Sequence, residues 1–212
     1  TKKIKLKKGI ILDHGCASGL TMLPWIKKKW DAIGIDPHKP SVRLGKRKYK
    51  LNIKNAFGEK LPFKDNKFDV ILSLGSLEHS YDLKKSMNEI KRTLNKNGYL
   101  IIRWRSDDLI GSPLEYYNHN HYRFFTKKTW NLLLKYYGFS SITHINKDIE
   151  GYKSYLYILA KNSGIKSKRF KNNKYYLSEI KKHKSYLIKY YHKCLKIEGL
   201  IKEKKMSYKN QM

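Results

Sequence analysis

The sequence predicts an α/β fold in which helices cover both faces of a mostly parallel sheet of about seven strands. Two apolar runs, 10–12 and 32–35, flank a glycine-containing turn, and the second run ends in Asp36, 21 positions after Gly15. The segment 68–74 is almost continuously apolar, as expected of a central parallel strand that is covered on both faces. Strand, helix and strand in this order predict a βαβ unit.

The first half of the chain alternates short strands with helices. We expect strands at 10–12, 32–35, within 51–57 and at 68–74, and a helix at 21–30. Leu83, Met87, Ile90 and Leu94 recur at helical spacing, so 82–94 is predicted to be a helix with Asp82 as its N-cap.

The second half is expected to complete the sheet. Asn97-Gly98 turns the chain into a fifth strand at 99–104. Thr126 is placed to cap a helix that runs to about residue 137, where Gly138 ends it. The alternating apolar residues of 141–145 and 154–161 predict a final antiparallel pair of strands.

The turn that follows the first strand, Asp13-His-Gly-Cys-Ala-Ser-Gly19, predicts a nucleotide-binding site. Glycines allow the backbone to approach a ligand closely, and a carboxylate at the end of the next strand can accept hydrogen bonds from a ribose diol. The Gly-x-x-x-Gly spacing differs from the Gly-x-Gly-x-x-Gly of domains that bind a pyrophosphate. We therefore expect an adenosine-containing cofactor without a diphosphate.

The motifs together resemble the class I S-adenosylmethionine-dependent methyltransferases, of the type 11 and type 23 kind. Besides the turn and Asp36, the resemblance rests on segments 58–63 and 68–74, on Leu77-Glu-His79 and on 94–102. It implies a three-layer, Rossmann-like fold, S-adenosyl-L-methionine as cofactor and S-adenosyl-L-homocysteine as product. The segment 1–9 has no room for the helices that such proteins carry before the first strand, so we expect a fragment or processed form with an open cofactor site.

The resemblance also implies which residues contact the cofactor. They lie in the turn, at the end of the second strand, in the loop before the fourth strand and at that strand's end: Asp13, Gly15, Cys16, Ala17, Gly19, Asp36, Pro37, Gly58, Glu59, Leu61, Leu74, Gly75 and Ser76. Ala17 departs from the family pattern, which has glycine there. The added methyl group carries no charge, so we expect the turn to survive. Asp13 and Glu59 have turn or helix capping as an alternative role.

The acceptor site is expected beside two segments. His79 lies where the family's methyl group points and could accept a proton, or could simply begin a helix. The loop before Thr126 is dense in polar aromatic residues, and it supplies His121 as a second catalytic candidate. Candidate acceptor-binding residues are His119, Tyr122 and Arg123, together with Arg105. No metal is expected, because no Cys or third ligand accompanies His119 and His121.

Composition bounds the setting of the protein. The 212 residues are enough for one domain with a sizeable core, predicted at 1–164, and an extension at 165–212. Two distant cysteines, Cys16 and Cys194, offer neither a disulfide framework nor a metal site and fit a cytoplasmic location. No apolar run is long enough to span a membrane, and 10–12 is too short for a secretory signal.

The formal net charge of +30 comes from 47 basic and 17 acidic residues. Lysine far outnumbers arginine, so biased composition and RNA binding both remain open explanations. The extension at 165–212 holds 15 basic and three acidic residues and an apolar stripe that predicts one long helix. That helix is expected to pack on its own domain or on a second copy, with a nucleic-acid arm as the alternative.

We expect a methyltransferase that acts on an oxygen or nitrogen of a small-molecule or glycan-like acceptor. A first alternative is an RNA methyltransferase that uses the basic extension. A second is a non-catalytic relative that keeps the fold as a binding subunit. The identity of the acceptor does not follow from the sequence.

Overall fold

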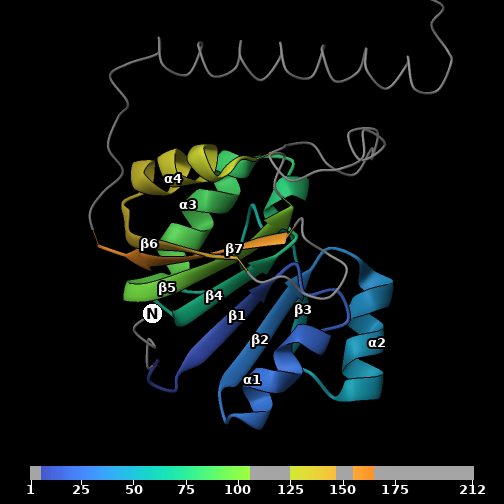
Figure 1. Cartoon of the computed structure of the whole chain (residues 1–212). Helices are drawn as coiled ribbons and strands as arrows, with labels where there is room; N and C mark the ends of the chain where they lie inside the picture. Colours follow the sequence, from blue (N-terminus) through green and yellow to red (C-terminus); the bar gives the residue numbers. More distant parts are fainter. Residues whose placement is uncertain (1–5, 106–124, 147–154, 165–212) are drawn as a thin grey trace, which may run out of the picture. The chain divides into compact units, whose positions relative to one another are not determined.

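A seven-stranded sheet forms the centre of the described structure, with strand order β3-β2-β1-β4-β5-β7-β6 (Figure 1). The computed structural model describes residues 6–105, 125–146 and 155–164. Neighbouring strands pair in parallel except β7, which runs antiparallel to both β5 and β6. The expected α/β class and the final antiparallel pair are therefore confirmed.

The strands are β1 (Ile10–His14), β2 (Asp31–Asp36), β3 (Ile53–Asn55), β4 (Phe68–Leu74), β5 (Leu94–Arg105), β6 (Phe139–Asn146) and β7 (Tyr155–Asn162). The helices are α1 (Leu23–Lys27), α2 (Lys39–Tyr49), α3 (Leu83–Thr93) and α4 (Lys127–Tyr136), with short 3-10 turns η1 (Leu20–Met22) and η2 (Leu77–His79).

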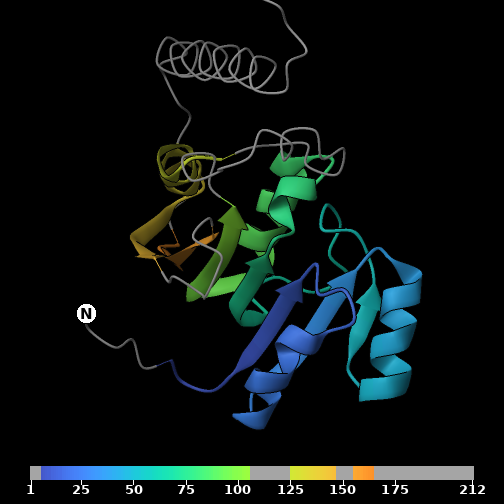
Figure 2. The same cartoon turned by 45° about the vertical axis from the view of Figure 1, so that its right-hand side comes forward.

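The helices form a layer on each face of the sheet (Figures 1 and 2). Successive strand residues point to opposite faces, so Leu12 packs with Met87 of α3 and Trp130 of α4 in one apolar cluster. Its neighbour Ile11 packs in a second cluster with Met22 of η1 and Val42 of α2. Both faces of β1 are thus dry, which explains its short, uninterrupted apolar run.

Three predicted helix ends, at Asp82, Thr126 and Gly138, agree with the structure. The Asp82 carboxylate accepts a hydrogen bond from the Lys85 N–H at 3.0 Å, as an N-cap does. Thr126 and Thr129 form a reciprocal capping box at the start of α4. Gly138, directly after α4, has a φ of 72°, the left-handed conformation expected of a terminating glycine.

The first helix and the fifth strand differ in extent from the prediction, and helix α2 is not predicted by the sequence pattern at all. The first helix ends at Lys27, because Lys29 adopts a φ of 62° and turns the chain into β2. Strand β5 begins at Leu94, five residues earlier than expected. Helix α2 buries only Val42 and Gly45, so its sequence lacks the apolar period that identifies a helix.

Within the described residues, no helix is long and apolar enough to cross a membrane. The long helix expected at 165–212 lies outside the part of the chain that the structure describes.

Candidate functional site

The candidate site lies at the carboxyl ends of β1, β2 and β4. The turn at 15–19 leaves β1 here and is fixed to β2, since the N–H groups of Gly15 and Cys16 both donate to the Ile35 carbonyl, at 3.0 and 2.9 Å. The chain closes the turn with a bond from the Gly19 N–H to the Cys16 carbonyl at 2.7 Å. Ligands of open α/β sheets bind at this edge.

Three residues of the turn adopt left-handed backbone conformations. The φ angles are 77° at Gly15, 48° at Ala17 and 81° at Gly19. A Cβ on Gly15 would lie 2.4 Å from the Cβ of Ser76, and one on Gly19 would lie 2.7 Å from Leu51 Cδ1. Ala17 keeps the conformation for which the family has glycine, at a cost of about 1 kcal/mol. The turn therefore survives the alanine, as expected.

Asp36 ends β2 and is 9% exposed. One carboxylate oxygen accepts the Ala17 N–H and the other accepts the His38 N–H, each at 2.8 Å. A carboxylate has about four acceptor positions, so each oxygen retains one for a further donor. Asp36 is thus a fixed acceptor at the turn, suited to a ribose diol. Pro37 follows it, and its carbonyl accepts from the Asn55 side chain.

Asp13, the last residue but one of β1, is 2% exposed and accepts a hydrogen bond from the Thr21 hydroxyl. Burial raises the pKa of the Asp13 carboxyl to about 6, which the bond from Thr21 partly offsets, while the charge of Asp36 raises the pKa further. Because the donor is a side-chain hydroxyl and η1 has Gly19 as its N-cap with no side-chain cap, this bond ties the end of β1 to η1 without capping it.

Cys16 is a small buried side chain in the same turn. It is 5% exposed, and a Cβ on Gly34 of β2 would lie 2.5 Å from its sulfur. Burial raises the pKa of the Cys16 thiol, so the sulfur stays protonated.

His14 is a buried residue of the site that the sequence pattern does not single out. The Ser76 hydroxyl donates to the His14 carbonyl at 2.6 Å and lies 3.1 Å from His14 Nδ1. Since a hydroxyl has one hydrogen, Nδ1 must be the donor in the second contact, which leaves Nε2 as an acceptor. Burial lowers the pKa of His14 to about 4, so the ring is neutral.

The ring of His14 packs against the loop before β4 and leaves no room for a side chain at residue 58. Its Nε2 is buried and has no hydrogen-bond partner among the described residues. A Cβ on Gly58 would lie only 2.2 Å from Nε2. The neighbouring Glu59 accepts the Asp82 N–H at 3.3 Å, and Leu61 is 4% exposed. Gly58 is therefore needed for close packing on His14.

Arg92 of α3 binds the loop at 58–63, a contact that the sequence pattern does not reveal. Its guanidinium donates to the carbonyls of Leu61 and Phe63, at 3.2 and 2.8 Å. It also forms a two-bond ion pair with Glu89, at 2.8 and 2.7 Å, and a contact with Asp65 at 2.7 Å. The hydrogen bonds from Arg92 hold the pKa of the Glu89 carboxyl below its usual value.

Glu78 and Arg103 lie beside the turn that ends β4, and neither is singled out by the sequence pattern. Gly75 has a φ of 85°, and a Cβ there would lie 3.4 Å from Arg103 Nη2 and 3.7 Å from Glu78 Oε1. Arg103 Nη2 donates to the Leu74 carbonyl at 2.9 Å. Glu78 is 8% exposed, and burial raises its pKa. The adjacent His79 is exposed.

Four carboxylates therefore gather at this edge of a chain whose net charge is strongly positive: Asp13, Asp36, Glu59 and Glu78. A pyrophosphate would be repelled by them, whereas a cationic sulfonium and an ammonium group would be attracted. The fixed Asp36 and this charge fit S-adenosylmethionine.

Most of the remaining residues predicted to bind the acceptor lie outside the part of the chain that the structure describes. Residues 119, 121, 122 and 123 are not among the described ones, and of Arg105 only the backbone, at the end of β5, is described. Within the described ranges, no group of three or more His, Cys, Asp or Glu side chains is arranged to hold a metal ion.

The fold and the site define an α/β domain that binds a nucleoside-containing cofactor. Residues 12–102 match the family described as "Methyltransferase domain". This match covers less than half of the chain and makes the segment similar to methyltransferases, and together with the structural relatives described below it implies S-adenosylmethionine as the cofactor.

The chain is similar to proteins with different acceptors. It is 35% identical over 102 residues to a ubiquinone biosynthesis O-methyltransferase of Pelagibacter ubique, a match that covers 46% of this chain and 42% of that protein. It is 34% identical over 125 residues to a tRNA U34 carboxymethyltransferase of Campylobacter fetus, covering 54% and 44%. The chain spans less than half the length of these curated relatives.

Among solved structures, the fold is similar to that of an S-adenosylmethionine-dependent methyltransferase of Thermotoga maritima, described as a possible histamine N-methyltransferase. The TM-score is 0.62 at 22% identity, over 74% of this chain and 84% of that one. A putative methyltransferase of Haloferax volcanii, solved with the activator Trm112, gives 0.61 at 14% identity, over 72% and 82%.

Gly58→Ala is predicted to weaken binding of S-adenosylmethionine about tenfold, because the new methyl group would overlap His14 Nε2 and displace the loop. Isothermal titration calorimetry measures the affinity. Gly58→Ala combined with His14→Ala removes the overlap and should restore much of it. Wild-type affinity in the single variant would contradict the packing argument.

Ala17→Gly is predicted to raise the free energy of unfolding by about 0.5–1 kcal/mol, because it removes a Cβ from a left-handed residue. Ala17 is exposed, so little packing is lost. Urea denaturation measures the change. Ala56→Gly, at a residue without a positive φ, serves as control and should destabilise. A loss of stability in Ala17→Gly would refute strain at this residue.

Proposed function

We propose that the chain transfers the methyl group of S-adenosylmethionine to an oxygen or nitrogen of a small-molecule or glycan-like acceptor, by in-line displacement. The observation that carries the proposal is Asp36, whose carboxylate is fixed against the left-handed turn with an acceptor position left on each oxygen. The similarity to a ubiquinone biosynthesis O-methyltransferase supports an oxygen acceptor of small size.

The bound cofactor supplies an activated methyl group on a sulfonium, and the protein's task is to set the line of attack and exclude water. Asp36 would hold the ribose, and Gly58, Glu59 and the buried Leu61 would lie along the adenine. The turn at 15–19 would present its backbone to the methionine end, beside Asp13. Leu74, Gly75 and Ser76 would pass under the reacting centre.

The reacting end would lie at the turn that follows β4, where Glu78 and Arg103 both face Gly75. An acceptor hydroxyl must lose its proton as the oxygen–carbon bond forms. Glu78 is suited to take that proton, because its Oε2 is buried without a hydrogen-bond partner in the described structure. Arg103 carries the positive charge that an anionic group on the acceptor would require.

His79 and His121 remain proton-acceptor candidates, with His79 exposed next to Glu78. Binding of the acceptor by His119, Tyr122, Arg123 and Arg105 remains a proposal on the sequence pattern. The same holds for the division of the chain at residue 164, for a homo-oligomer formed through 165–212 and for a cytoplasmic location.

An RNA acceptor is the second candidate function. The net charge of +30 and the similarity to a tRNA U34 carboxymethyltransferase favour it. An RNA substrate would make turnover fall steeply with salt, whereas a small acceptor would not. A non-catalytic binding subunit is less well supported, because Ala17 keeps the left-handed turn intact.

Asp36→Ala is predicted to weaken S-adenosylmethionine binding more than about tenfold, since it removes a charged acceptor of ribose hydrogen bonds. Calorimetry on the full chain measures the dissociation constant at low and high salt. Asp31→Ala is the matched control, because Asp31 is an exposed acid at the opposite end of the same strand. Equal affinity in the two variants would refute the ribose assignment. No binding by the wild-type chain would refute the enzyme proposal.

Glu78→Gln is predicted to lower kcat by about a hundredfold, the loss typical of a missing proton acceptor. The wild-type rate should rise with pH through a pKa above that of an ordinary glutamate, because burial raises it, and this limb should vanish in the variant. Methyl transfer to a panel of phenols and hexoses provides the assay. His79→Gln is the neighbouring control; if it alone abolishes the limb, His79 is the proton acceptor.

A further inference from the structure

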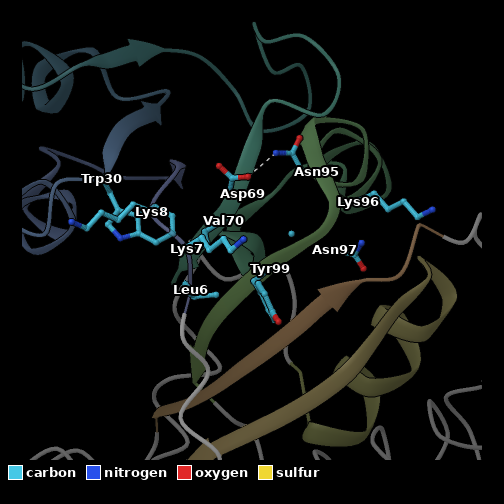
Figure 3. A pocket seen from close by; sticks show the side chains of 11 residues that line it. Leu6, Lys7, Lys8, Trp30, Asp69, Val70, Asn95, Lys96, Asn97 and Tyr99 are labelled. Atoms are coloured by element: carbon cyan, nitrogen blue, oxygen red, sulfur yellow. Dashed lines mark hydrogen bonds between the residues drawn. The ribbon is translucent and has the colours of Figure 1, made fainter.

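A cavity of about 270 Å³ lies at the amino ends of the parallel strands, the edge opposite to the candidate cofactor site. Its walls come from residues 6–8, which lead into β1, and residues 95–99 of β5 (Figure 3). Asp69 and Val70, near the start of β4, and the indole of Trp30 complete the lining. Nothing in the proposed methyl transfer uses this cavity.

Asp69 holds both walls in place. Its Oδ2 accepts the Ile10 N–H at 2.8 Å, and its Oδ1 accepts from Asn95 Nδ2 at 2.8 Å. A Cβ on Gly9 would lie 2.0 Å from Asp69 Oδ2, so the first wall passes directly over this carboxylate. Asp69 therefore has a structural role, with a hydrogen bond at each oxygen.

The second wall is a bulge in β5, residues 95–98, whose backbone is held in place. Leu94 pairs with Phe68 and Tyr99 with Val70, so the residues 95–98 lie opposite Asp69 alone. Asn97 has a φ of 67°, which the turn requires. The Asn162 side chain donates to the carbonyl of Asn95 at 3.0 Å. The wall is thus tied to both β4 and β7.

Three lysines line the cavity: Lys7, Lys8 and Lys96. In Figure 3, Lys8 lies beside Trp30, Lys7 lies near Val70 and Tyr99, and Lys96 lies at the opposite end from Lys8, with the two end lysines extending in opposite directions. A Cβ on Gly164 would lie 2.9 Å from Lys96 Cγ, so the stem of Lys96 packs on the end of β7 rather than extending freely. Within the described residues, none of the three forms an ion pair.

We propose that this cavity binds a backbone phosphate of single-stranded RNA. Lys7 lies between Lys8 and Lys96, which lie at the two ends of the cavity (Figure 3), so the three lysines are spread along the path of one RNA strand, and each can bind phosphate as a point charge. The half-buried ring of Tyr99 supplies an aromatic surface for an adjoining base.

The lining favours RNA over an anionic membrane. The large exposed apolar side chains of the described structure are Leu20, Leu23, Ile26, Leu44, Phe57 and Tyr81, and none of them lines the cavity. A membrane-binding surface needs apolar groups beside its lysines to enter the acyl region. A polymer also benefits from the positive charge of the rest of the chain, which a single nucleotide cannot reach.

The site is independent of the proposed methyl transfer, because the cavity and the cofactor edge lie at opposite ends of the same strands. RNA bound here can be the acceptor only if it extends across the domain to the cofactor edge. The binding experiment therefore needs no cofactor, and its failure leaves the proposed function untouched.

The test is fluorescence anisotropy of a labelled ten-nucleotide oligouridylate with the full chain. The triple variant Lys7→Gln, Lys8→Gln and Lys96→Gln should weaken binding about tenfold and flatten its salt dependence. The control triple variant Lys46→Gln, Lys84→Gln and Lys135→Gln removes three exposed lysines elsewhere and should change affinity less than about twofold, since distant charges are screened. Equal losses in the two triple variants would overturn the proposal.

A second variant separates a built site from simple charge. Asn95→Ala retains every lysine but removes the tie between the bulge and Asp69, and should weaken binding about threefold. An unchanged circular dichroism spectrum and thermal unfolding midpoint show that each variant is folded. Wild-type RNA affinity in Asn95→Ala would overturn the built site. The proposal would also be overturned if UMP, or vesicles of anionic phosphatidylserine, bound the chain as tightly as the oligouridylate does.

Discussion

The left-handed turn between β1 and η1 is the constraint on which the site depends. Two N–H groups of the turn donate to one carbonyl of β2, and the next N–H donates to Asp36. These bonds fix the turn against β2 and, in the same step, fix the carboxylate beside the turn. Gly15 and Gly19 meet the steric requirement, while Ala17 tolerates it at a small cost. The residues proposed to bind the cofactor are thus fixed within the first βαβ unit.

The rest of the cofactor edge is held by contacts between segments distant in sequence. His14 fixes the position of Gly58, and Arg92 binds the carbonyls that follow it. The charges separate along the strands: carboxylates gather at the carboxyl edge, and Lys7, Lys8 and Lys96 at the amino edge. This separation explains how a chain of net charge +30 can offer an anionic environment to a cationic cofactor.

Much of the fold follows from local signals. Strand β4 was predicted over its full length because a buried parallel strand is continuously apolar. Asp82, Thr126 and Gly138 mark helix ends because capping depends on residues near in sequence. Helix α2 gives no such signal, since most of its residues are exposed and its apolar face is small.

The sequence alone determined the order of the strands, the class of cofactor and the residues of the glycine turn, because these depend on patterns among neighbours in the chain. Only the tertiary structure decided that His14 leaves no room for a side chain at Gly58, that Glu78 is buried where His79 is exposed, and that three lysines line the same cavity as Asp69. These relations join segments far apart in the chain. Their distances depend on how the strands pair, which no local pattern specifies.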